Sequence, residues 1–166
     1  LFEIYSENST TVFLNTYKVS LGELVHRVGT PISSKIFGFN GFPTFLNRDV
    51  LEVSLWNPDD ESVLKRICDE LKTDFLLVDD RIGLVTPRVI CMIINEAYYT
   101  VQDGTASRAD VDMAMKLGTN YPFGPFEWCK RIGIKHVYEL IEALYDDTQD
   151  ERYKISPLLK KEYLKN

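Results

Sequence analysis

The stretch Asn120-Tyr-Pro-Phe-Gly-Pro-Phe-Glu-Trp128 decides the fold of the second half of this chain. Two prolines and a glycine restrict its backbone, and four aromatic side chains give it apolar surface to bury. Gly124-Pro125 places a proline at the first turn of a helix, where its missing N–H leaves no hydrogen bond unmade. The stretch therefore predicts a rigid, packed corner between a helix that ends at Gly118 and a short helix that ends at Gly133.

Helical patterns continue on both sides of this corner. Before it, residues 87–104 form a long, mostly apolar pattern that starts with a proline and stops at a glycine. Ser107-Arg-Ala-Asp110 then resembles a capping box with aspartate in the glutamate role. After the corner, residues 134–145 place apolar side chains on one face, and Ser156-Pro157 begins a last, exposed-looking helix. The second half is therefore predicted to be all helix.

The first half has a different pattern, in which strands alternate with helices. Runs rich in β-branched and aromatic residues predict strands over residues 9–16, 35–39, 50–56 and 74–78. One helix is predicted from the capping box Ser20-Leu-Gly-Glu23 to the break at Pro31, and another from Asn57-Pro58 to about Leu71. This alternation is typical of an α/β domain.

The composition changes near residues 79–83, which divides the chain into an α/β part, 1–79, and a helical part, 80–166. The net charge is −6, so neither part is expected to offer a basic surface to nucleic acid or anionic lipid. The longest apolar runs are far too short for a membrane span. Three cysteines without a C-x-x-C pair and two isolated histidines favour buried thiols in a cytoplasmic protein over disulfides or a metal site.

Glu52 is the one carboxylate that interrupts a predicted strand. Period-two alternation places it beside Val50 and Trp56, on the face opposite Val53. A glutamate in this setting is either solvated or held in a cleft, and the spacing alone leaves both alternatives open.

Phosphate-binding motifs are weak in this sequence. There is no G-x-G-x-x-G and no Walker A loop, and Gly38-Phe-Asn-Gly41 is typical of a turn that ends a strand. The chain therefore has no visible pyrophosphate site for a dinucleotide. Lys130-Arg131 and Lys160-Lys161 could contact phosphates or could be solvated charge pairs.

The segment Asp112-Met-Ala-Met-Lys-Leu-Gly-Thr-Asn-Tyr-Pro-Phe-Gly-Pro-Phe-Glu-Trp128 resembles the signature of the C-terminal domain of 3-hydroxyacyl-CoA dehydrogenases. Further matching residues follow in order: Asp80-Arg-Ile-Gly83, Arg88, Ile94-Asn-Glu-Ala97, Gly104, Ser107-Arg-Ala-Asp110 and Ser156-Pro-Leu-Leu159. Upstream, Asn15-Thr16 and Leu51-Glu52-Val53 resemble short motifs of the family's nucleotide-binding domain. The resemblance implies an α/β remnant of a Rossmann-type domain followed by an all-α helical bundle of the 6-phosphogluconate dehydrogenase C-terminal-like kind. The Rossmann glycine fingerprint is expected outside this chain, which begins with Leu1.

The family's reaction implies a role for a few positions. NAD takes a hydride from carbon 3 of a 3-hydroxyacyl-CoA, a histidine takes the hydroxyl proton, and a glutamate orients that histidine. The glutamate corresponds to Glu52, but the histidine position is Asn40, and asparagine cannot act as a base. The implied substrate-binding positions are Asn15, Thr16, Tyr17 and Pro87. Among them, Tyr17 stands where the family has a serine and Pro87 where it has an asparagine.

The resemblance thus implies an oxidoreductase of fatty-acid β-oxidation that uses acyl-CoA and forms a homodimer through its helical domain. Of the family's four positions, glutamate, histidine, serine and asparagine, only the glutamate is kept, whereas Asn40, Tyr17 and Pro87 depart from the pattern. We therefore expect this chain to be inactive alone and to bind no NAD. We expect Asn40 and Glu52 to lie within hydrogen-bond reach of each other. The alternatives are a non-catalytic acyl-CoA-binding or dimerisation module descended from the dehydrogenase, and a related 3-hydroxy-acid dehydrogenase for another thioester.

Overall fold

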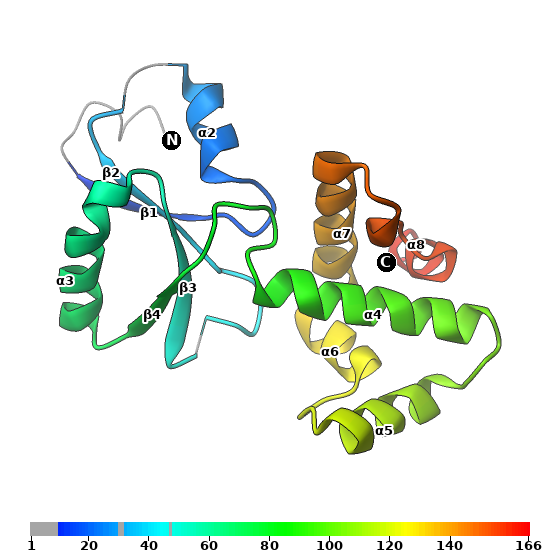
Figure 1. Ribbon diagram of the computed structural model, residues 1–166. Helices are drawn as coiled ribbons and strands as arrows, with labels where there is room; N and C mark the ends of the chain where they lie inside the picture. Colours follow the sequence, from blue (N-terminus) through cyan, green and yellow to red (C-terminus); the bar gives the residue numbers. More distant parts are fainter. Residues whose placement is uncertain (1–9, 30–31, 47) are drawn as a thin grey trace. The chain divides into compact units, whose positions relative to one another are not determined.

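The computed structural model describes residues 10–29, 32–46 and 48–166 (Figure 1). The chain divides into two compact units, Leu1–Val85 and Thr86–Asn166. The first unit contains a β-sheet with helices, and the second is helical (Figure 1). The expected fold class is therefore confirmed.

In the first unit, strands and helices follow the predicted order. The elements are β1 (Thr11–Asn15), α2 (Leu21–Val28), β2 (Lys35–Phe39), β3 (Val50–Leu55), the 3-10 turn η1 (Pro58–Asp60), α3 (Glu61–Leu71) and β4 (Asp74–Leu77). The last three predicted strands agree with the structure to within one residue. The first is shorter than predicted among the described residues, and Ser9 and Pro31 lie outside them.

The four strands lie in the order β1-β2-β3-β4. β1 pairs with β2, and β3 with β4, in parallel, whereas β2 and β3 are antiparallel. The two parallel pairs therefore run in opposite directions. Because crossovers between parallel strands are right-handed, α2 and α3 lie on opposite faces of the sheet. Leu64 and Cys68 of α3 pack on Phe37 and Val53, which form the core of one face.

The segment between β4 and the helical unit belongs to the first unit. The Asp80 carboxylate accepts hydrogen bonds from the backbone N–H groups of Leu21 (2.7 Å) and Gly22 (2.9 Å), at the start of α2. The Gly83 N–H donates to the carbonyl of Tyr17 (2.9 Å). These bonds tie residues 80–85 to the sheet, so the structural boundary lies six residues after the one placed by composition.

Helices make up most of the second unit. They are α4 (Thr86–Gln102), α5 (Arg108–Thr119), α6 (Pro125–Ile132), α7 (Ile134–Thr148), the 3-10 turn η2 (Glu151–Tyr153) and α8 (Pro157–Tyr163). α7 runs three residues beyond its predicted end. Within the described parts of the chain, every helix is too short or too polar to cross a membrane.

α4 is the central helix of this unit and contacts α5, α6, α7 and α8. Its buried side chains include Cys91, Ile94 and Tyr98. The buried Asn95 amide donates to the carbonyl of Lys154 (2.8 Å) and accepts from the N–H of Ser156 (2.9 Å). Two motifs far apart in sequence, around Asn95 and Ser156, are thus joined by one side chain that fixes the start of α8.

The predicted corner is held by the carboxylate of Asp112. Its two oxygens accept hydrogen bonds from the N–H groups of Phe126 (2.8 Å) and Glu127 (3.2 Å) at the start of α6. The Glu127 carboxylate accepts in turn from the Gly124 N–H (3.0 Å) and pairs with Lys116 (2.6 Å). The Lys116 hydrogen bond, and after it the Gly124 N–H, lowers the pKa of Glu127.

Gly124 is required at the corner because a side chain there would collide with Asp112. A Cβ at position 124 would lie 2.4 Å from the Asp112 Cγ. We expect Gly124→Ala to lower the free energy of unfolding by about 1–3 kcal/mol, since Asp112 must shift and release the α6 N–H groups. Gly118→Ala is the matched control, because a Cβ at Gly118 meets nothing within 4 Å. Urea unfolding of both variants measures the difference, and equal stabilities would contradict this account of the corner.

Candidate functional site

Asn40 and Glu52 face each other across β2 and β3. The antiparallel register pairs Gly38 with Ser54, so Asn40 follows one side-chain step along the same face. The Asn40 N–H donates to the Glu52 carbonyl (3.0 Å), and the Asn40 Nδ2 donates to the Glu52 Oε2 (3.4 Å). The expected approach of the two side chains is therefore confirmed, through a long hydrogen bond.

The carboxylate of Glu52 also accepts a hydrogen bond from the main chain. The Val85 N–H lies 3.1 Å from its Oε2, and the side chain is half-buried. Asn40 is 4% exposed, and its Oδ1 accepts from the Phe42 N–H (3.0 Å). Both polar side chains are thus held by backbone groups as well as by each other, and neither of the two alternatives for Glu52, fully solvated or closed in a cleft, describes it completely.

Asn15 positions the loop that follows β2. Its Nδ2 donates to the Gly41 carbonyl (3.3 Å), and its Oδ1 accepts from the Gly41 N–H (3.0 Å). A Cβ at Gly41 would lie 2.5 Å from the Asn15 Cγ. The glycine is therefore required for the amide to reach both backbone groups of residue 41, next to Asn40.

Thr16 and Tyr17 are buried. The Thr16 hydroxyl and the Ser54 hydroxyl have no hydrogen-bond partner among the described residues, and both side chains are fully buried. They converge over Gly38, where a Cβ would lie 2.4 Å from the Ser54 Oγ and 2.6 Å from the Thr16 Oγ1. Tyr17 packs edge-on against Phe42, with ring centroids 5.1 Å apart.

The structure brings the implied site residues of the first unit to the ends of β1 and β2. Asn15 and Thr16 follow β1, and Asn40 follows β2 beside Glu52. Pro87 belongs to the helical unit, where it is buried in the first turn of α4.

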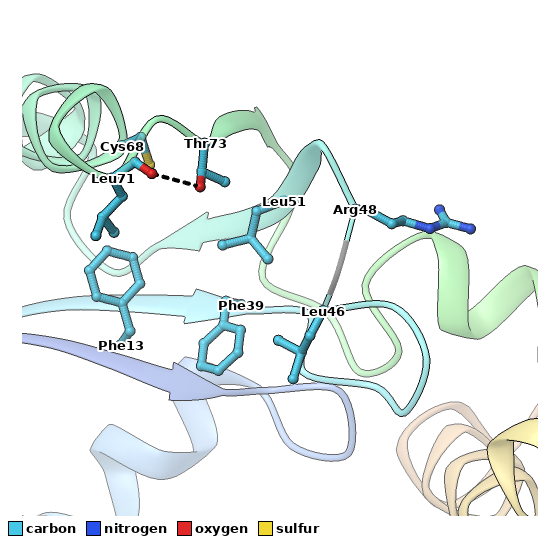
Figure 2. Close-up of a pocket in the computed structure, with 8 residues that line it drawn as sticks. All are labelled: Phe13, Phe39, Leu46, Arg48, Leu51, Cys68, Leu71 and Thr73. Carbon is cyan, nitrogen blue, oxygen red and sulfur yellow. Dashed lines mark hydrogen bonds between the residues drawn. The ribbon is translucent and has the colours of Figure 1, made fainter.

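A pocket on the other face of the sheet was not predicted from the sequence. It has a volume of about 290 Å³, and its lining residues are Phe13, Phe39, Leu46, Arg48, Leu51, Cys68, Leu71 and Thr73 (Figure 2). Figure 2 shows the Arg48 side chain extending away from the other labelled side chains. Burial, and after it the Asp69 carboxylate, raises the pKa of Cys68, so this thiol is not an activated nucleophile. The pocket is suited to an apolar group and not to proton transfer.

The sequence carries a signal for this pocket, in the apolar side chains that alternate along three strands. Phe13, Phe39 and Leu51 share the α3 face, and that helix leaves part of it open. Strand alternation predicts the shared face, whereas only the position of α3 shows which part stays uncovered.

The helix starts that follow strands do not fit the pyrophosphate of a dinucleotide. At α2, the first N–H groups already bond to Asp80, and the Glu23 N–H bonds to the Ser20 hydroxyl (3.1 Å). At η1, the Asn57 side chain accepts from the Asp59 N–H (3.1 Å), and acidic side chains fill the first turn. At α2, the Asp80 carboxylate occupies the N–H groups that a pyrophosphate would need. At η1, the acidic side chains would repel the negative charge of a pyrophosphate. Within residues 10–29, 32–46 and 48–166, no group of three or more His, Cys, Asp or Glu side chains is arranged to hold a metal ion.

Comparisons with known proteins agree with the sequence resemblance. The sequence model of the protein family "3-hydroxyacyl-CoA dehydrogenase, C-terminal domain" matches residues 83–166. A 3-hydroxybutyryl-CoA dehydrogenase of Clostridioides difficile is 30% identical over 97% of this chain and 58% of its own length. A 3-hydroxyadipyl-CoA dehydrogenase of Escherichia coli is 40% identical over 54% of this chain, but only 19% of its own length.

A solved structure shows the same likeness. The crystal structure of 3-hydroxybutyryl-CoA dehydrogenase from Escherichia coli K12 superposes with a TM-score of 0.77 at 27% identity, over 93% of this chain and 32% of that one. The chain therefore spans less than two thirds of the length of each of these relatives.

The Asn15–Gly41 contact can be tested by a double-mutant cycle. Gly41→Ala forces the Asn15 amide away from both backbone groups of residue 41, so we expect the lost hydrogen bonds to lower the free energy of unfolding by about 0.5–1.5 kcal/mol. In an Asn15→Ala background the collision is gone, and the same change should be milder by at least about 0.5 kcal/mol. Urea unfolding of the four proteins gives the coupling energy. Strictly additive effects would show that the amide does not fix this loop.

Proposed function

The chain belongs to the 3-hydroxyacyl-CoA dehydrogenase family, and we propose that the polypeptide of which it forms a part acts on 3-hydroxyacyl-CoA thioesters by NAD-dependent oxidation to 3-oxoacyl-CoA. Fatty-acid β-oxidation is the setting that this activity implies. The 166 residues do not complete the reaction by themselves. The observation that carries this second part of the proposal is the contact between Asn40 and Glu52.

Asn40 leaves the site without a proton acceptor in the place where the family has its base. A carboxamide neither gains nor loses a proton near neutral pH, so it can bind a substrate oxygen but cannot remove its proton. Glu52, freed from orienting an imidazole, accepts hydrogen bonds from Asn40 and Val85. The site is thus polar, but the position of the family's histidine base holds an amide that cannot accept the proton.

NAD is expected to bind elsewhere in the polypeptide and not to this chain. The first N–H groups of α2 bond to Asp80, and the 3-10 turn η1 begins with acids, so neither offers a phosphate cradle. When bound, NAD would supply the hydride acceptor. The residues of this chain would contribute the substrate side of the site.

The second candidate function is acyl-CoA binding or dimerisation without redox chemistry. Asn40 favours it directly, because an amide at this position keeps hydrogen bonding and abolishes proton transfer. Assay of the polypeptide that also carries the nucleotide-binding half separates the two functions, since a dehydrogenase consumes acetoacetyl-CoA and NADH and a binding module leaves both unchanged.

A homodimer through the helical unit completes the proposal. α5 has no fully buried residue, and its Met113 and Leu117 side chains are 58% and 81% exposed, one helical turn apart. α4, whose sequence is apolar on most of its circumference, is largely covered by its own neighbours, although Val89 stays exposed. The exposed apolar surface for a second copy therefore lies chiefly on α5.

Restoring the base tests the function. We expect this chain to show no reduction of acetoacetyl-CoA by NADH. In a polypeptide that also carries the nucleotide-binding half, Asn40→His should raise activity by about 10²-fold, the lower end for a general base, since Tyr17 and Pro87 still differ from the family. Asn40→Gln is the control, because it keeps the amide. Equal activity of the histidine and glutamine variants would contradict a role for position 40 in proton transfer.

Light scattering tests the dimer. We expect a mass of two chains that falls to one chain in Leu117→Glu, since a carboxylate cannot be buried unpaired in an apolar contact. Leu164→Glu changes a side chain of comparable exposure (70%) beyond the end of α8, and it should leave the dimer intact. A wild-type mass of one chain at every concentration would exclude this assembly.

A further inference from the structure

The helical unit has a cleft whose lining includes none of the family's implied site residues. This cleft, of about 660 Å³, lies where α6 meets α7, and α4, α5 and α8 each contribute one side chain to its wall. The lining residues with basic side chains are Arg108, Lys130, Lys135 and His136. Among the described residues that line it, Glu162 is the one with an acidic side chain.

The cleft carries positive charge although the chain as a whole is acidic. The protein has a net charge of −6, yet residues 129–136 contain two lysines and an arginine and no acid. Lys130 and Lys135 both extend from this segment into the cleft wall. Lys135 is weakly paired, 3.8 Å from Glu139, and among the described residues no ion pair engages Lys130. Two lysine charges on the wall of one cleft repel each other and attract an anion.

The one acidic side chain is already neutralised within the cleft. Glu162 forms an ion pair with Arg108 and accepts a hydrogen bond from the Tyr98 hydroxyl (3.1 Å). The Arg108 guanidinium also lies over the rings of Tyr98 (5.3 Å) and Phe126 (5.0 Å). Tyr98, Glu162 and Arg108 therefore form an ordered wall, and the charge left to meet a ligand is that of the two lysines.

Part of the cleft surface is apolar. Phe126, Ile132 and Ile134 contribute aromatic and aliphatic surface between the charged groups. The neighbouring Arg131 takes no part, because it stacks on Phe123 (3.8 Å). Of these two adjacent residues, Lys130 lines the cleft and Arg131 does not. A pocket with apolar walls and a few convergent polar groups is the usual form of a small-molecule site.

We propose that this cleft binds a small organic phosphate that carries an aromatic or apolar moiety. The phosphate group would bind at Lys130 and Lys135, and the apolar moiety would pack against Phe126 and Ile134. Lysine binds phosphate as a point charge, and the apolar walls add contact area for the rest of the molecule. The site is distinct from the Asn40–Glu52 site, and it does not depend on dehydrogenase activity.

AMP and inorganic phosphate are the probes for this site. Calorimetric titration of the 166-residue chain should show saturable AMP binding that weakens as salt rises, because exposed charges are screened. Inorganic phosphate should bind at least about tenfold more weakly, since it has no apolar moiety to bury in the cleft. In a spectrum of backbone amides, AMP should shift the signals of Phe126, Ile132 and Ile134. If inorganic phosphate bound as tightly as AMP, the proposed recognition of an apolar moiety would be overturned.

Removing the lysine charges from the cleft wall is the second test of the proposal. Lys130→Gln with Lys135→Gln should weaken AMP binding about tenfold or more, and both side chains are exposed, so the fold should survive. Lys160→Gln is the matched control, because it removes an exposed lysine of the same unit outside the cleft. No saturable AMP binding by the wild-type chain, or equal losses in the double variant and the control, would overturn the proposal.

Discussion

Backbone N–H groups at helix starts have no partner within the helix, and this constraint organises both units of the protein. Asp80 satisfies the first N–H groups of α2 from almost sixty residues away, and Asp112 does the same for α6 across the corner. A carboxylate suits this position because it accepts through two oxygens and complements the positive end of the helix dipole. Each aspartate therefore fixes the packing of two segments with a single side chain.

The same constraint applies to α2 and η1, the two helix starts that follow strands in the described part of the first unit. A dinucleotide needs free N–H groups at a glycine-rich turn between a strand and a helix. Here Asp80 and Ser20 already use the N–H groups of α2, and acids surround the start of η1. Backbone groups also hold Glu52 and Asn15, through Val85 and Gly41. Asn15 and Glu52 thus form hydrogen bonds that stabilise loops as well as lining the candidate site.

Close approach accounts for two glycines that define local shape. Gly124 lies against Asp112, and Gly41 lies against Asn15, with no room for a Cβ at either position. The conformational freedom of glycine is not required at these two positions, since neither has a positive φ. The requirement is steric, and it arises from a side chain distant in sequence. The long motif of residues 112–128 is therefore explained by packing at the corner.

The sequence by itself determined which segments form helices and strands, because capping residues and apolar periodicity are local features of the chain. The side chains of Ser20, Asn57 and Ser107 cap helices where predicted, and strand alternation correctly separated Glu52 from Val53. It also determined that Asn40 stands opposite Glu52, through the resemblance to a family with a known pairing. Only the tertiary structure decided the direction of the β2–β3 pairing, the partners of Asp80 and Asp112, and the two hollows. Those features depend on contacts between segments that are far apart in the chain, where no local periodicity records which residues meet.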